Sequence, residues 1–263
     1  MKLIQIDAEK CKKDKLCIIE CPFNILRENS DGIPEVIPEA EAMCMKCGHC
    51  LAVCPSGALT LDGVSPESCD PSRKDIVVDA AAMEDLLKNR RSVRVYKKKP
   101  VEREQVAHLM EMLRWAPTAK NLQPVHWLLI DDGEKIRELA GMTIEWLKAG
   151  GVYPEIVEAW EGGEDMILRS APLIAIAHAA TDGLTPAVDC AIAATSLDLA
   201  ATSYGIGSFW AGFFMLASNQ YAPISEYLKL PDNHAVYSAL ALGYPKFKYH
   251  RIPQRQESNF NWL

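Results

Sequence analysis

Four cysteines in one short segment constrain this 263-residue chain more than any other feature. Residues 43–55 read MCMKCGHCLAVCP, so Cys44, Cys47, Cys50 and Cys54 are spaced by three, three and four positions, and Pro55 follows the last. Thiolates at this spacing can surround an iron–sulfur cluster, and a fourth cysteine that precedes proline is typical of a ligand to a second cluster. The segment therefore indicates single-electron chemistry.

Zinc or a redox disulfide is the alternative use of paired cysteines. A zinc ribbon separates its two cysteine pairs by a longer loop, whereas here three cysteines fall within residues 44–50. The spacing favours an iron–sulfur cluster over both alternatives.

A second cysteine run lies upstream and departs from the first at one position. Cys11, Cys17 and Cys21, the last again followed by proline, align with the first run, and Asp14 then stands where Cys47 stands there. A carboxylate is a harder ligand than a thiolate and holds iron less firmly. Asp14 is therefore either a labile fourth ligand or a solvated acid beside a three-iron cluster.

Together the two runs resemble the two-cluster bacterial ferredoxins, over residues 1–63. The resemblance implies a [4Fe-4S] cluster and a second cluster that is either [4Fe-4S] or [3Fe-4S]. It also implies that the last cysteine of each run crosses to the other cluster. One cluster would then take Cys21, Cys44, Cys47 and Cys50, and the other Cys11, Cys17 and Cys54, with Asp14 or with no fourth ligand.

Length and composition indicate two domains. Residues 1–63 are too few for a secure core of their own, and two clusters would supply cross-links. Residues 64–80, which contain Pro66, Pro71 and three serines, are expected to be a linker, and residues 81–263 a second domain. Cys69 falls in this linker, where a free surface thiol is favoured over a ligand.

Charge and hydropathy indicate which partners and which cellular compartment to expect. A formal net charge of −7 disfavours nucleic acid, and no apolar run is long enough to span a membrane, since the stretch from residue 187 to 204 is interrupted by Asp198. The N-terminal residues lack the order of a signal peptide, and cluster-ligating thiols fit a reducing compartment. We expect a cytoplasmic protein.

Residues beyond the linker alternate between helical and strand-like periodicity, which favours an α+β layered domain. The predicted strands are residues 126–131, 172–179, 208–214 and 235–243. The predicted helices are residues 102–115, 134–148, 154–160, 185–204 and 219–228.

Three segments of this domain could hold a phosphorylated cofactor. In an extended chain, residues 90–94 (RRSVR) would present Arg90, Ser92 and Arg94 on one side. The two guanidinium groups could then bind a phosphate monoester. The alternative is that this segment is simply a basic surface. Residues 116–124 (APTAKNLQP) form a loop with polar groups for a flat heterocycle. Residues 242–245 (LGYP) place Gly243 at a strand end, followed by basic residues that include Arg251.

In this order and spacing the three segments resemble the FMN-dependent nitroreductase family, over about residues 83–255. The resemblance implies a three-layer α/β/α sandwich and an obligate homodimer with FMN at the subunit interface. The implied FMN contacts are Arg90, Arg91, Ser92, Arg94 and Arg251 around the phosphate, and Pro117, Thr118, Asn121, Gln123 and Gly243 near the flavin. Members of the family usually take hydride from a nicotinamide, but a fused ferredoxin departs from that plan. The donor is therefore open between NAD(P)H and a ferredoxin-type protein.

The combined prediction is an iron–sulfur flavoprotein oxidoreductase that reduces a small organic acceptor, such as a nitroaromatic or a quinone. The sequence does not single out a catalytic side chain. An electron-transfer or redox-sensing module for a protein partner is the alternative, and a protein that modifies its own flavin is a third hypothesis. His108 falls on a predicted helix, and His126 and His178 fall on predicted strands, where packing explains them. His49 is a loop residue beside a cluster ligand, and its alternative role is to tune the potential of that cluster. Any of these histidines could donate a proton to product, but nothing in the sequence singles one out.

Overall fold

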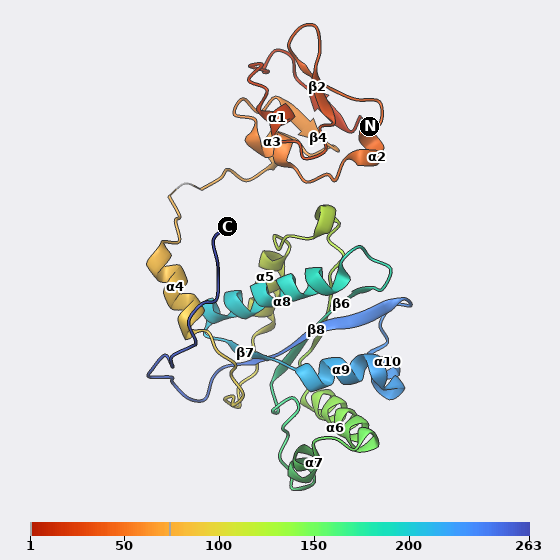
Figure 1. Ribbon diagram of the computed structural model, residues 1–263, viewed down its shortest axis with the longest axis vertical. Coiled ribbons are helices and arrows are strands. Elements are labelled where there is room, and N and C mark those ends of the chain that lie inside the picture. The colour runs from red at the N-terminus through yellow and green to blue at the C-terminus, as the bar shows by residue number, and fades with distance from the viewer. Residues whose placement is uncertain (1, 74) are drawn as a thin grey trace. The chain divides into compact units, whose positions relative to one another are not determined.

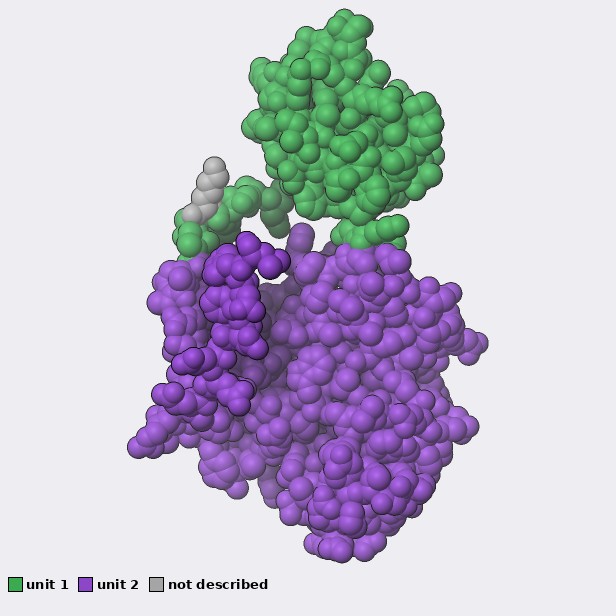
Figure 2. All heavy atoms as spheres, viewed as in Figure 1, with its two compact units in different colours: residues 1–77, 120–122 green, residues 78–119, 123–263 purple. Residues whose placement is uncertain are grey.

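The computed structural model describes residues 2–73 and 75–263, which form two compact units. The first unit contains residues 1–77 and 120–122, and the second contains residues 78–119 and 123–263 (Figure 2). Each unit has its own core: Leu26 and Leu59 are buried in the first, and Leu139 and Phe214 in the second.

Two small antiparallel sheets build the first unit. Strand β1 (Ile4–Ile6) pairs with β4 (Leu59–Leu61), and β2 (Leu26–Glu28) pairs with β3 (Pro34–Val36). The helices are α1 (Leu16–Ile19), α2 (Ala40–Met43), α3 (His49–Val53) and the 3₁₀ turn η1 (Pro66–Ser68). Elements this short bury little apolar surface, and the core also includes Cys17 and Cys50. A core of this size provides little stability by itself, so we expect bound clusters to stabilise the unit.

A four-stranded antiparallel sheet organises the second unit, with strand order β5-β6-β8-β7. The strands are β5 (His126–Ile130), β6 (Leu173–Ala180), β7 (Gly207–Trp210) and β8 (His234–Gly243). The helices are α4 (Ala80–Asn89), α5 (Arg103–Leu113), α6 (Gly133–Gly150), α7 (Pro154–Glu161), α8 (Pro186–Ala201), α9 (Gly212–Gln220) and α10 (Ala222–Leu228), with 3₁₀ turns η2 (Ala119–Asn121) and η3 (Thr202–Tyr204).

Helices cover both faces of this sheet (Figure 1). Successive strand residues point to opposite faces, so on β6 the side chains of Leu173 and Ala175 pack with α5 and α8. Ile174 and Ile176 join the core on the other face, with α6, α7, α9 and α10. The predicted α+β class and three-layer α/β/α sandwich are thereby confirmed.

Two predicted elements in the second half differ from the structure. The strand expected over residues 208–214 ends at Trp210, and Phe214 is fully buried in α9. A short aromatic run cannot by itself be distinguished from a buried helical turn. The helix expected over residues 219–228 is two helices, because α9 ends at Gln220 and Pro223 lies in the first turn of α10, where a missing N–H does no harm.

Helix α4 follows the expected linker and was not predicted. It begins at Ala80, where the Asp79 side chain accepts a hydrogen bond from the backbone N–H of Ala82 at 2.8 Å. Such a cap satisfies one of the free donors at a helix start. Its apolar residues Met83 and Leu87 are 42% and 55% exposed, so packing does not account for it. Met1 and Lys74, in the expected first domain and linker, lie outside the described residues.

Candidate functional site

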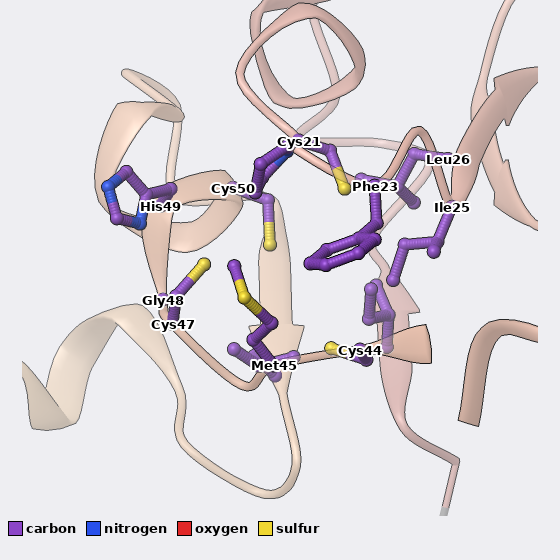
Figure 3. Close-up of a pocket in the computed structure, with 13 residues that line it drawn as sticks. Cys21, Phe23, Ile25, Leu26, Cys44, Met45, Cys47, Gly48, His49 and Cys50 are labelled. Atoms are coloured by element: carbon purple, nitrogen blue, oxygen red, sulfur yellow. The ribbon is translucent and has the colours of Figure 1, made fainter. Parts of the chain in front are cut away.

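Four cysteines line one apolar cavity of the first unit (Figure 3). Cys21 comes from the loop after α1, and Cys44, Cys47 and Cys50 come from the segment that leads into α3. The rest of the lining is largely apolar and includes Phe23. Four soft thiolates in an apolar shell are a suitable donor set for a [4Fe-4S] cluster. The cavity unites the ligands that the ferredoxin resemblance assigns to one cluster.

Two left-handed residues bring these thiols together. Lys46 has φ 50° and Gly48, which directly precedes α3, has φ 78°. A glycine adopts this conformation without the penalty that a Cβ imposes. The chain therefore turns between successive cysteines, and three thiols from one short segment reach a single cavity.

A second cavity contains the remaining predicted ligands. Its lining includes Cys11, Asp14, Cys17 and Cys54, and Ser56 lies beside them. The Asp14 side chain is exposed, and its Oδ1 accepts a hydrogen bond from the backbone N–H of Leu16 at 3.2 Å. Asp14 is thus beside three thiols while one of its oxygens accepts a hydrogen bond from the first residue of α1.

Hydrogen bonds reach the sulfurs of both cavities. Cys44 Sγ accepts from the N–H of Lys46 at 3.4 Å, and Cys54 Sγ accepts from the N–H of Ala58 at 3.3 Å. Ser56 Oγ lies 3.6 Å from the same Cys54 sulfur. Hydrogen bonds to ligand sulfurs are one of the factors that set the reduction potential of a cluster.

Burial favours the protonated form of the innermost thiols. It raises the pKa of Cys50 to about 11, and it raises the pKa of Cys17, where the nearby Cys54 and Cys11 act in the same direction. Iron binds the thiolate form, so assembly must displace these protons. Iron uptake by this unit is therefore pH-dependent.

The arginine segment of the second unit is fixed against β7 and α8. Arg90 Nη1 donates to Asp198 Oδ2 at 3.1 Å, and Ser208 Oγ donates to the other oxygen of the buried Asp198. Ser92 forms a parallel bridge to Ser208, and the N–H of Val93 donates to the Ser208 carbonyl at 2.8 Å. The extended conformation expected for residues 90–94 is present.

A hollow next to this segment gathers some of the predicted phosphate ligands. It is lined by Arg90 and Arg91, but not by Ser92, Arg94 or Arg251. The Arg91 guanidinium lies 4.5 Å from the centre of the Tyr249 ring, and that of Arg94 lies 5.7 Å from the centre of the Phe209 ring. Arg251 is exposed in the extended tail. One chain by itself does not bring all of these groups to one hollow.

The loop of residues 116–124 is held by α8. The N–H of Ala119 donates to Asp189 Oδ1 at 2.9 Å, and Thr118 Oγ1 accepts from the N–H of Gln123 at 3.0 Å. Pro117 and Gln123 are exposed. Asn121 is grouped with the first unit, where its Nδ2 donates to the Lys46 carbonyl at 3.2 Å.

Gly243 and a second glycine permit close packing inside this unit. A Cβ on Gly243 would lie 2.7 Å from Pro172 Cδ and from Tyr96 Cδ1. A Cβ on Gly207 would lie 2.4 Å from a Val93 side-chain carbon. Both contacts are closer than real Cβ atoms allow, so glycine is required at each position. Packing thus accounts for Gly243, and its place near a flavin stays a prediction.

Two buried acids of α8 were missed by the analysis of motifs. Asp189 and Asp198 are nine residues apart, about two and a half helical turns, so they lie on opposite sides of the helix. Asp198 holds the segment of residues 90–94 and Asp189 holds the loop of residues 116–124, two of the three predicted FMN-binding segments. The available signal was the presence of two carboxylates in a helix of otherwise small and apolar residues, because buried acids are normally paired.

Comparison with known proteins assigns the family. Residues 87–244 match the nitroreductase family, and residues 9–59 match the 4Fe-4S dicluster domain. The chain belongs to the nitroreductase family. It is an FMN-dependent oxidoreductase with an N-terminal ferredoxin-type domain.

This nitroreductase-family chain is similar to several other oxidoreductases. A putative NADH dehydrogenase/NAD(P)H nitroreductase of Archaeoglobus fulgidus is 30% identical over 167 residues, which are 62% of this chain and 87% of that protein. An FMN reductase (NAD(P)H) of Bacillus subtilis is 30% identical over 178 residues, covering 64% of this chain and 69% of that protein. A crystal structure of a nitroreductase with bound FMN from Bacteroides fragilis shares the fold, with a TM-score of 0.60, 24% identity and coverage of 68% of this chain and 97% of that one.

In residues 2–73 and 75–263, no helix has the length and hydropathy needed to cross a membrane.

Proposed function

We propose that this chain passes electrons between its iron–sulfur clusters and FMN and uses them to reduce a small organic acceptor, such as a nitroaromatic or a quinone. The observation that carries the proposal is the cavity in which Cys21 joins Cys44, Cys47 and Cys50, on a chain that also contains a nitroreductase domain. Clusters exchange single electrons, whereas bound FMN exchanges one or two. Fusion of the two domains would therefore couple one-electron donors to a two-electron reduction.

We propose that the cysteines lining each of the two cavities ligate one cluster. Soft thiolates dominate both sets, and the carboxylate in the second set would bind iron less firmly. The first set is Cys21, Cys44, Cys47 and Cys50, and the second is Cys11, Cys17 and Cys54 with Asp14.

The FMN contacts we propose come from three segments that α8 and the ends of β7 and β8 hold in place. Guanidinium groups bind phosphate by charge-assisted hydrogen bonds, and Asp198 would fix the orientation of the Arg90 guanidinium. The proposed phosphate contacts are Arg90, Arg91, Ser92, Arg94 and Arg251. The proposed flavin contacts are Pro117, Thr118, Asn121, Gln123 and Gly243.

We also propose that the active form is a homodimer, with a ferredoxin domain of residues 1–63, a linker of residues 64–80 and an FMN-binding domain of residues 81–263. The hollow beside residues 90–94 is lined by only two of the five predicted phosphate contacts, Arg90 and Arg91. A second subunit would supply the groups that one chain does not gather there.

The decisive experiment interrupts the path between the clusters and FMN. Residues 1–63 are deleted, or Cys47 is changed to Ser, and flavin reduction by a reduced one-electron protein donor is followed anaerobically. We expect rapid flavin reduction to be lost while FMN stays bound and direct reduction by dithionite is unchanged. Cys69→Ser, which removes an exposed thiol outside both cavities, is the matched control and should behave as wild type.

Unchanged flavin reduction in Cys47→Ser would contradict the proposal and favour the electron-transfer or redox-sensing alternative. The donor and the acceptor are identified by an anaerobic screen of NADH, NADPH and reduced ferredoxin against nitroaromatics and quinones. A donor that reduces FMN only when the ferredoxin domain is intact acts through the clusters.

A further inference from the structure

The loop and helix that carry Cys11 and Cys17 present a basic, partly apolar surface. We call it the α1 face, and its members are Lys12, Lys13, Lys15, Leu16 and Ile19. All five are exposed, and the apolar side chains of Leu16 and Ile19 are 39% and 77% exposed. An apolar centre with a charged rim is the usual anatomy of a protein–protein interface.

The positive charge of this face is only partly neutralised. Residues 9–20 contain four lysines and three acids, the last of which is the exposed Glu20 directly after α1, in a chain whose net charge is −7. Lys15 pairs with Glu28 at 2.7 Å, and Lys10 pairs with Glu67 at 3.2 Å. Within the described residues, no carboxylate forms an ion pair with Lys12 or Lys13. These two lysines are therefore free to meet an acidic partner.

The α1 face adjoins the second cavity, because it lies on the loop and helix that supply Cys11 and Cys17. Leu16 and Ile19 are three residues apart and share one side of α1, while Cys17 is 7% exposed and lines the second cavity. The segment around the first cavity, residues 39–48, has two glutamates and one lysine. That lysine, Lys46, is tied to Asp62 at 2.6 Å. The two cluster loops thus differ in charge.

We propose that the α1 face is the docking surface for an acidic electron-carrier protein. The inference rests on the proposed electron transfer through the clusters. One electron leaves the reduced centre of the carrier, which returns to its oxidised level, and enters the cluster held by Cys11, Cys17 and Cys54; no bond forms or breaks. Charge complementarity guides the encounter and sets its rate, and contact at Ile19 brings the two centres close.

Docking is measured first without electron transfer, as the affinity of the full-length protein for an oxidised acidic ferredoxin. We expect Lys12→Gln/Lys13→Gln to weaken binding by about tenfold at low salt, and the difference to disappear at about 0.5 M salt, where charges are screened. Lys97→Gln/Lys98→Gln, the same loss of charge from exposed lysines of the second unit, is the matched control and should leave binding unchanged. Ile19→Ser should weaken binding at every salt concentration.

Kinetics then separate this proposal from the proposed function. With the reduced ferredoxin as donor, the second-order rate of cluster reduction should fall in Lys12→Gln/Lys13→Gln, while reduction by dithionite stays at the wild-type rate. Unchanged binding in this variant, or equal loss in the Lys97/Lys98 control, overturns the docking surface. Unchanged binding with slower transfer from cluster to FMN also overturns it and assigns the face to the chain's own flavin domain. If docking depends on the lysines but the flavin is never reduced, the proposed function is wrong and the docking surface is supported.

Discussion

Asp14 is the residue that distinguishes the two cluster cavities. Its carboxylate stands beside Cys11, Cys17 and Cys54, where the other cavity has a fourth thiol. A carboxylate holds iron less firmly than a thiolate, and here one of its oxygens already accepts the Leu16 N–H. The two clusters should therefore differ in stability.

Mild oxidation of the anaerobically purified protein should convert only the Asp14-side cluster to a three-iron form. Asp14→Cys should suppress this conversion, because a fourth thiolate would retain the labile iron. Electron paramagnetic resonance measures the three-iron signal. Asp31→Cys, which adds a thiol at an exposed acid outside both cavities, is the control. Two clusters that respond identically to oxidation would contradict this prediction.

Arg90 combines a buried ion pair with a position on the predicted phosphate site. Its side chain is 26% exposed and its partner Asp198 is 7% exposed, so the pair is shielded but open to a ligand. A charge-assisted hydrogen bond to phosphate contributes about 1.5–3 kcal/mol.

Arg90→Ala should weaken FMN binding by about ten- to a hundredfold, with iron content unchanged. Equilibrium dialysis of FMN and iron analysis provide the two readouts. Arg103→Ala, which breaks an exposed Arg–Asp pair on α5, is the matched control and should bind FMN normally. An Arg90→Ala protein that holds FMN as tightly as wild type would exclude Arg90 from the phosphate site.

Three neighbouring strands of the second unit place their histidines together. His126 on β5 lies opposite His178 on β6, with ring centres 5.6 Å apart, and His178 Nδ1 lies 2.9 Å from His234 Nδ1 on β8. Burial, followed by the charges of His234 and His126, lowers the pKa of His178 from 6.5 to about 4. The folded sheet therefore favours the neutral imidazole.

Stability of the flavin domain should fall as the pH decreases from about 6.5 to 4. Over this range the unfolded chain binds the proton that folded His178 rejects, so acid favours unfolding, by no more than about 3 kcal/mol. Urea unfolding followed by tryptophan fluorescence reports on this domain, because all 6 tryptophans lie beyond residue 81. His178→Gln should flatten the pH dependence, and His250→Gln, an exposed tail residue, should not. Equal slopes in His178→Gln and wild type would refute the assignment.

At the scale of the whole molecule, helix α4 and the C-terminal tail are among the segments of the second unit that expose apolar side chains. Met83 and Leu87 of α4 are 42% and 55% exposed, and Phe260 and Trp262 of the tail are 68% and 91% exposed. Large exposed apolar surface marks sites of association. These segments are the ones we expect a second copy of the chain to cover.

Sedimentation should therefore give about twice the chain mass of 29.2 kDa. Removing residues 252–263 should weaken both dimer formation and FMN retention, because the tail supplies apolar contact area. Deletion of residues 1–63 serves as the control and should leave the dimer intact. A monomer that retains FMN at micromolar concentration would contradict the homodimer.

Local patterns predicted most of the elements of the second unit. Helix α5 and strands β5, β6 and β8 lie within about two residues of their expected bounds, because their periodicity is strong and continuous. The strand expected at residues 208–214 and the helix expected at residues 219–228 were wrong where an aromatic run and a proline changed the backbone. Helix α4 was missed, since it is exposed and begins directly at the linker.

The sequence by itself predicted the redox chemistry of this protein, because the proposed cluster ligands and most of the proposed FMN contacts lie in short runs whose residue types and spacing are characteristic. Only the tertiary structure decided which groups meet. Asp189 holds the loop at Ala119, Asp198 joins Arg90 to Ser208, and His178 meets His234 across two strands. These contacts join residues that are far apart along the chain, and their formation depends on how the sheet and α8 pack. Contacts made by long-range packing produce no local sequence pattern from which they could be predicted.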